Sequence, residues 1–169
     1  MASITDQALP AKPLGADRFE TMLAVGAVLM LAAMTTALLK GYAQWGRLPP
    51  MVWVHLATIS VALVLTPVML LRPRGDQPHR YLGRIWVAAM LSTALSSFFV
   101  AQSTNGGWSV IHILSVWVSI QVPIIYWSAR THRKSLHRRL IRGMVLGALL
   151  IAGFFTFPFN RQLGAWLFS

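Results

Sequence analysis

The segment MVWVHLATISVALVLTPVMLL, residues 51–71, decides the fold of this chain. It contains no Asp, Glu, Lys or Arg, and its length is close to the roughly 20 residues that a helix needs to cross a bilayer. Three further segments, 85–101, 108–129 and 143–159, are also free of charged residues. Of all 169 residues, 56% are hydrophobic and 11% are charged, whereas about a quarter of the residues of a soluble domain are charged. These features indicate an integral membrane protein.

The apolar segments predict five transmembrane helices, at residues 20–39, 51–71, 82–101, 108–129 and 140–159. Helices are expected because lipid forces each spanning segment to satisfy its own backbone hydrogen bonds. A β-barrel would need alternating strands of about ten residues, and these apolar runs are continuous. We therefore predict an all-α integral membrane protein in which helices two to five form a four-helix bundle.

The positive charge is concentrated at two connections between these helices. The net charge is +11, and most of the arginines lie at 72–84 and 130–142, whereas the connection at 101–108 has no charged residue. Positive residues stay on the cytoplasmic side during insertion. We therefore predict a multi-pass protein of the bacterial inner membrane, with a cytoplasmic N-terminus and a periplasmic C-terminus. The loop with Lys40 and Arg47 is an exception, and nucleic acid is not expected as a partner.

The chain is accordingly expected to have five parts, namely a cytoplasmic N-terminal tail (1–19), the first helix with an outer loop (20–50), a first helical hairpin (51–104), a second helical hairpin (105–160) and an outer C-terminal tail (161–169). The sequence has no cysteine, which excludes thiolate metal sites, disulfide bonds and covalent haem attachment through C-x-x-C-H. Its four acidic residues argue against a proton pump, because pumps relay protons through buried carboxylates.

The two hairpins repeat one pattern of residues. The first runs from His55 through Pro67 and Arg72 to the hexad HRYLGR at 79–84, and the second contains His112, Pro123, Arg130 and the hexad HRRLIR at 137–142. The offset between matching residues is 56 to 58 positions. Both hairpins start from the same side of the membrane, so the pattern predicts a parallel repeat about an axis along the membrane normal.

The repeat makes four histidines candidate metal ligands. His55 and His112 are predicted at equal depth near the outer surface, and His79 and His137 at equal depth near the inner surface. If each histidine meets its copy across the axis, each level can hold one haem iron. Other interpretations remain open. A single histidine near a span end can bond a backbone carbonyl, and His79 and His137 are expected before their helices, where an exposed loop histidine is ordinary.

Four arginines of the hexads, Arg80, Arg84, Arg138 and Arg142, are candidate partners of haem propionates, because guanidinium matches the geometry of a carboxylate. They could equally bind anionic lipid headgroups or only enforce the topology. Gln121 could bond another helix or a quinone carbonyl. Six tryptophans near the span ends are expected to form an aromatic belt at the membrane surfaces, namely Trp45, Trp53, Trp86, Trp108, Trp127 and Trp166.

At the repeated His-Arg hexads the chain resembles a bacterial membrane family known as domain of unknown function 2306, over residues 51–160. The layout is also similar to the two-haem, ascorbate-reducible cytochromes b, in which four histidines on consecutive helices pair first with third and second with fourth. That resemblance implies haem between His55 and His112 and between His79 and His137. The His-to-His separations of 24 and 25 residues are shorter here, which moves the inner pair to the membrane edge.

Two functions follow as hypotheses. The first is a transmembrane b-type cytochrome that holds one or two haem b groups and transfers electrons as a membrane oxidoreductase, with a quinone or small reductant as partner. The second is a cofactor-free accessory subunit or assembly factor of a larger membrane complex. A small transporter is third, and the lack of deep charges weakens it.

Overall fold

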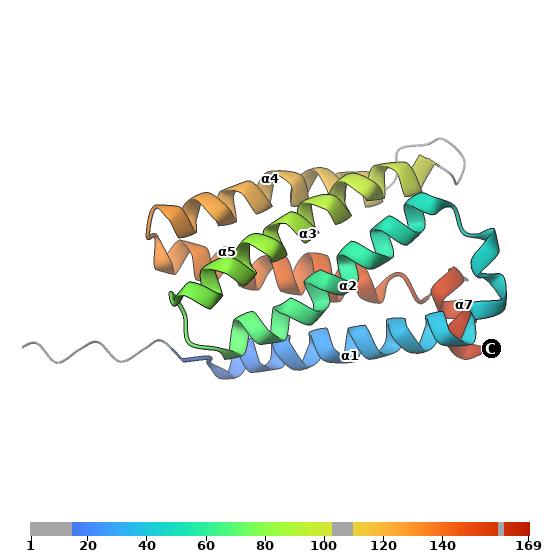
Figure 1. Ribbon diagram of the computed structural model, residues 1–169, viewed down its shortest axis with the longest axis horizontal. Helices are drawn as coiled ribbons and strands as arrows, with labels where there is room; N and C mark the ends of the chain where they lie inside the picture. The colour runs from blue at the N-terminus through green and yellow to red at the C-terminus, as the bar shows by residue number, and fades with distance from the viewer. Residues whose placement is uncertain (1–14, 103–109, 159–160) are drawn as a thin grey trace, which may run out of the picture.

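The computed structural model describes residues 15–102, 110–158 and 161–169, and this part of the chain is helical without strands. The elements, in chain order, are α1 (Arg18–Lys40), the 3-10 helix η1 (Tyr42–Arg47), α2 (Pro50–Leu71), α3 (Gln77–Gln102), α4 (Val110–Arg130), α5 (Lys134–Met144), the π-helix η2 (Val145–Ile151), α6 (Ala152–Phe154) and α7 (Gln162–Phe168). Figure 1 shows that the long helices run side by side along one axis. The predicted all-α class is confirmed.

Four helices in the described part of the chain, α1 to α4, are long and apolar enough to cross a membrane. The fifth predicted span, 140–159, lies across α5, η2 and α6, which follow one another without a break from Lys134 to Phe154. The middle of this segment is a π-helix, in which each backbone N–H bonds one residue further back than in an α-helix. The fifth span therefore stays a prediction.

The two hexads lie inside helices, so the prediction that His79 and His137 precede their helices is wrong. The Asp76 side chain accepts a hydrogen bond from the backbone N–H of His79 at 2.8 Å, and α3 begins at the next residue after Asp76. In α5, the N–H of His137 donates to the carbonyl of Arg133 at 2.9 Å. Capping groups and turns decide where a helix begins, so both helices extend beyond their apolar segments.

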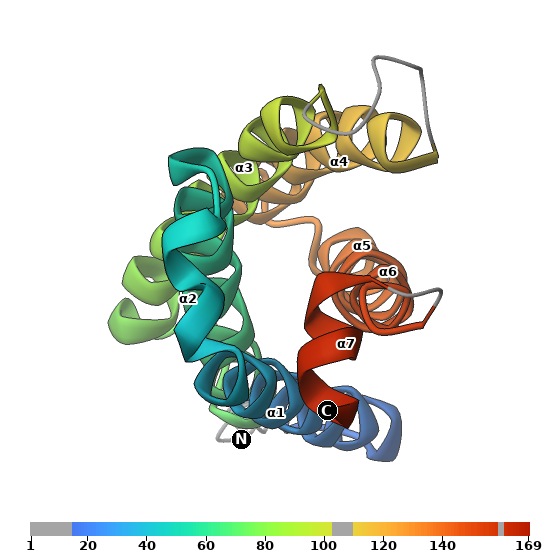
Figure 2. The ribbon, with the colours of Figure 1, turned by 90° about the vertical axis from the view of Figure 1, so that its right-hand side faces the viewer.

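The helices follow one another around the bundle in chain order. Figure 2 shows α1, α2, α3 and α4 along an arc that α5 and α6 close. From α1 to α5 each long helix packs against the next, and α1 also packs against η2 and α7. Helix α3 thus lies between α2 and α4. One core joins the helices, with Ala27, Leu63, Met90, Val122 and Leu149 among its most buried members.

The two ends of the bundle differ in character. We call the basic end the one that carries Asp17, the α2–α3 loop and the α4–α5 turn. At the opposite end the predicted C-terminal tail forms α7, whose Trp166 is 3% exposed and packs on Gly41. Trp86 is 4% exposed. The side chain of an aromatic-belt residue lies exposed at the membrane surface. Trp86 and Trp166 are buried, so the prediction of a belt is wrong for these two residues. Trp108 lies outside the described residues.

Candidate functional site

A cavity of about 150 Å³ lies at the basic end, between α2, α3, α4 and α5. His79 on α3 and His137 on α5 both line it, so the inner histidines of the two hairpins share one space. The rest of its wall is mostly apolar, and three arginines contribute to it. The other lining residues are Thr66, Met69, Leu70, Arg80, Gly83, Arg84, Trp86, Val87, Ile125, Tyr126, Ala129, Arg130, Ile141 and Val145.

Helical spacing brings these side chains to one place. His79, Gly83 and Val87 follow one another at four-residue intervals on α3, and His137, Ile141 and Val145 do the same across α5 and the start of η2. Residues four apart share a helix face, so each histidine stands at the end of an apolar stripe. The four-residue spacing is present in the sequence, but it places these side chains on one face only because both hexads are helical.

His137 is held in a defined orientation. Its Nδ1 lies 3.1 Å from the carbonyl oxygen of Ile125 and 3.2 Å from the hydroxyl of Ser128. A carbonyl can only accept, so Nδ1 carries the proton and donates, and Nε2 keeps its lone pair. Burial lowers the pKa of His137, against the opposing effect of the hydrogen bond to Ile125, and the nearby charge of Arg74 lowers it further. A neutral imidazole anchored to a carbonyl through Nδ1 is the usual form of a metal-ligating histidine.

His79 is held through its backbone, and its ring is less constrained. Its Nδ1 is buried and has no hydrogen-bond partner in the described part of the chain. Deeper in the same wall, Trp86 Nε1 donates to the hydroxyl of Thr66 at 3.0 Å, and that hydroxyl donates to the carbonyl of Ala62 at 2.7 Å. Trp86 is therefore a fixed part of the cavity wall.

The outer histidines both contact α3. Nδ1 of His55 lies 3.2 Å from the Thr93 carbonyl and at the same distance from the hydroxyls of Ser96 and Ser97. The His112 ring centroid lies 6.1 Å from that of Phe98. Both rings thus lie beside one short segment of α3, at the same level of the bundle. Neither lines the cavity, so the predicted outer haem level stays an untested prediction.

Three arginines meet two acids where α1 begins. Glu20 is 1% exposed, and Arg138 binds both of its oxygens, at 2.7 Å through Nε and 3.0 Å through Nη2. Arg74 and Arg142 also pair with Glu20. Asp17 pairs with Arg138 and Arg142, and its pKa is lowered mainly by the backbone N–H of Glu20. We call these five residues the ion cluster.

The ion cluster separates the arginines of the two hexads. Arg138 and Arg142 point to the acids of α1, whereas Arg80 and Arg84 line the cavity. Glu20 was not among the predicted site residues, although D-x-x-E before an apolar run is a capping-box signature. The box is present, with Glu20 N–H donating to Asp17 at 2.9 Å. The signature could have predicted where α1 begins, but it could not have predicted the three arginine partners of Glu20.

The helical composition, the four candidate spans and the apolar outer surface define the chain as a multi-pass helical membrane protein. Among the described residues no group of three or more His, Asp or Glu side chains is placed to hold a metal ion. The chain belongs to the family described as "Predicted membrane protein (DUF2306)", whose model matches residues 52–166. This confirms the family resemblance. No curated protein and no solved structure matches the chain.

Proposed function

We propose that this protein is a b-type haem protein of the bacterial inner membrane that transfers electrons, with haem between His79 and His137. The observation that carries the proposal is that imidazoles from two separate hairpins line one cavity. Two histidines and an apolar surround are sufficient to hold a haem b without a covalent link. The haem, when bound, would supply one-electron redox chemistry.

The residues at the cavity fit such a group. His137 presents an unprotonated Nε2, since its Nδ1 donates to Ile125, and His79 lines the same cavity. Arg80, Arg84 and Arg130 line the same cavity and are exposed, so their guanidinium groups are available to carboxylates. Arg138 and Arg142 are engaged by Asp17 and Glu20, which makes them weaker candidates for the propionates.

The size of the cavity sets one condition for haem binding. Its volume of about 150 Å³ is smaller than the roughly 300–1,000 Å³ of most ligand sites. Haem would need side chains to move, and the exposed Arg80, Arg84 and Tyr126 can do so at the membrane surface. The buried wall with Trp86 and Leu70 would stay in place and exclude water.

The proposal includes the orientation of the protein in the membrane. We place the basic end in the cytoplasm, because its arginines would resist transfer across the membrane. The inner haem would then lie near the cytoplasmic surface, where a soluble reductant or a quinone headgroup can approach. A larger membrane complex is a further partner that this position allows.

An absorption spectrum of the purified protein tests the proposal. Protein from cells supplied with haem should show a Soret band that shifts on reduction, and His79→Ala and His137→Ala should each remove the part of it that the inner haem contributes. The matched control is His132→Asn, which changes an exposed histidine of the same end at a position with φ of 56° that asparagine tolerates. His55→Ala should leave this band in place and remove only a second, outer haem.

A colourless protein with full helicity would refute the haem proposal. It would favour the second hypothesis, a cofactor-free accessory subunit or assembly factor. Retention of the full Soret band in both His79→Ala and His137→Ala would show that haem binds elsewhere.

A further inference from the structure

The α2–α3 loop and the first turn of α3 hold three buried nitrogen atoms without an acceptor. Within the described part of the chain, Arg72 Nε, Arg74 Nη1 and His79 Nδ1 are buried and have no hydrogen-bond partner. More than about 90% of buried polar groups in proteins are hydrogen-bonded. Three such atoms within one short segment therefore indicate that an acceptor from outside the chain belongs there.

The protein fixes each of these side chains at another atom. Arg72 donates from Nη2 to Asp76 at 2.9 Å, and Arg74 donates from Nη2 to Glu20. Asp76 also accepts the backbone N–H of His79 at 2.8 Å, which ties the His79 backbone to the same carboxylate as Arg72. The two guanidinium groups are held by these acids, and each has one buried nitrogen without a partner among the described residues.

The charge around the three atoms defines the missing acceptor. Arg72 and Arg74 are the positive charges that act on the His79 ring, and Asp76 is the acid that acts on it. Arg74 acts on His137 as well. Four arginines, Arg72, Arg74, Arg138 and Arg142, share the three acids Asp17, Glu20 and Asp76. Positive charge therefore exceeds negative charge, and an anion is favoured over a neutral acceptor. Several N–H donors on neighbouring side chains are typical of oxyanion sites.

We propose that Arg72, Arg74 and His79 form a binding site for one phosphate-type oxyanion. The loop joins the C-terminus of α2 at Leu71 to the start of α3 at Gln77, so it lies at the depth of lipid headgroups. The oxyanion can come from the headgroup of an anionic phospholipid or from free phosphate. The proposal does not rest on haem, because it uses Nδ1 of His79 and two arginines outside the cavity lining.

The key variant is the double substitution Arg72→Lys with Arg74→Lys. It keeps both positive charges and removes the buried guanidinium nitrogens. The matched control is Arg133→Lys with Arg139→Lys, two exposed arginines of the same end. Loss of charge-assisted hydrogen bonds should weaken binding at least about tenfold in the key variant, and the control should change it less than about twofold.

Two measurements distinguish the sources. Calorimetric titration of inorganic phosphate into the full-length protein in detergent tests free phosphate. Native mass spectrometry of protein released from nanodiscs with phosphatidylglycerol, compared with phosphatidylcholine alone, tests the lipid headgroup. The proposal is supported if binding is seen in either experiment, is lost in the key variant and is kept in the control. The experiment that shows this binding identifies the source of the oxyanion.

Absence of binding in both arms overturns the proposal, as does an equal loss in the control variant. If the double variant does not fold, Arg72→Lys alone replaces it, because this change leaves the Arg74–Glu20 pair intact. Labelling histidine with ¹⁵N adds a readout at the site, since oxyanion binding should shift the Nδ1 resonance of His79. An unchanged resonance at saturating ligand would exclude His79 from the site.

Discussion

The substitution Glu20→Gln tests whether the ion cluster fastens α1 to the rest of the bundle. The Glu20 side chain is 1% exposed and is bonded by Arg74 from the α2–α3 loop and by Arg138 and Arg142 from α5. Glutamine has nearly the same shape and keeps one acceptor oxygen, but it lacks the charge. The change therefore leaves up to three guanidinium groups without their main counterion.

The magnitude follows from burial. Breaking a buried ion pair by removing one partner costs about 3–5 kcal/mol. The three arginine side chains keep 20%, 30% and 26% of their surface exposed, so water compensates part of the loss. Asp17 still pairs with Arg138 and Arg142. The expected decrease in the free energy of unfolding is about 2–3 kcal/mol.

Unfolding in dodecyl maltoside micelles with a rising fraction of sodium dodecyl sulfate, followed by far-UV circular dichroism, measures this change. Asp17→Asn is the control, because asparagine is an equally good helix cap and the Glu20 contacts remain, so its effect should be smaller. Combining Glu20→Gln with Arg138→Gln should cost less than the sum of the single changes. A decrease for Glu20→Gln no larger than that for Asp17→Asn, with additive double variants, would refute this account of the ion cluster.

Two further predictions concern the ends of the bundle. Gly164→Ala should cost about 1–3 kcal/mol in the same unfolding assay, because a Cβ there would lie 1.7 Å from the carbonyl oxygen of Phe157, whereas Gly46→Ala, with no atom within 4 Å of the added Cβ, should be close to neutral. At the basic end, the backbone N–H of His79 is the main cause that lowers the pKa of Asp76 below its usual 3.8, and Arg72 adds to the effect. The Asp76 carboxylate therefore stabilises the folded protein when the pH is above this usual value. This stabilisation is lost as the pH falls through the lowered pKa of the folded state. Between about pH 5 and pH 3, wild type should lose more stability than Asp76→Asn, and equal slopes would contradict the prediction.

The sequence predicted the helices well, because lipid imposes a length and an apolar composition on each span. Four of the five predicted spans agree with α1 to α4. Their ends were less predictable. The apolar run that starts at residue 82 gave no sign that Asp76 would start α3 before His79. A hydropathy pattern records where a helix meets lipid, whereas capping and turn hydrogen bonds decide where it begins.

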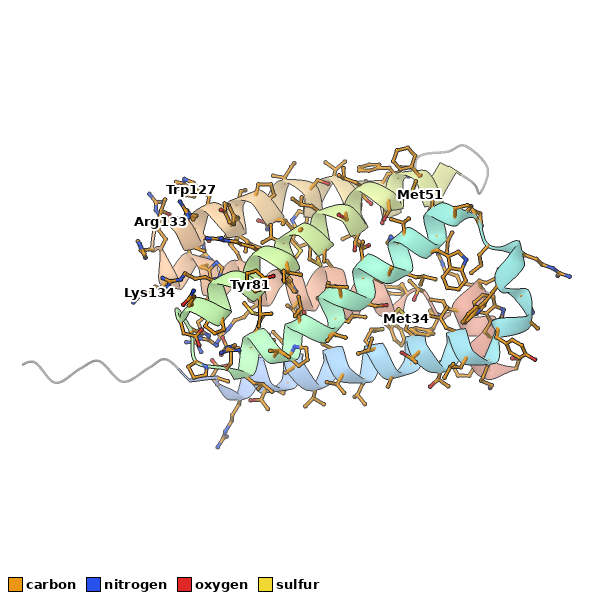
Figure 3. All side chains as sticks on the ribbon, viewed as in Figure 1. Met34, Met51, Tyr81, Trp127, Arg133 and Lys134 are labelled. Atoms are coloured by element: carbon orange, nitrogen blue, oxygen red, sulfur yellow. The ribbon has the colours of Figure 1, made fainter. Side chains whose placement is uncertain are left out.

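The candidate site was predictable in part. The repeat identified His79 and His137 as matching residues, and the structure places both on one cavity. Four arginines occupy matching positions in the two hexads, yet the fold turns Arg138 and Arg142 to Glu20 and leaves Arg80 and Arg84 at the cavity. Figure 3 labels Tyr81, Arg133 and Lys134 at the basic end, where the exposed charge of the sequence is concentrated. Which charge is paired depends on α1, and hairpin spacing contains no information about that helix.

The sequence by itself determined that this chain is a helical membrane protein with a strongly basic end, because composition and the spacing of charges along the chain are sufficient for that inference. The tertiary structure alone decided which polar groups meet: His79 with His137 at one cavity, Glu20 with three arginines, and Trp86 with Thr66. Such contacts depend on the order of helices around the bundle and on their rotation. Both are set by packing between segments far apart in the chain.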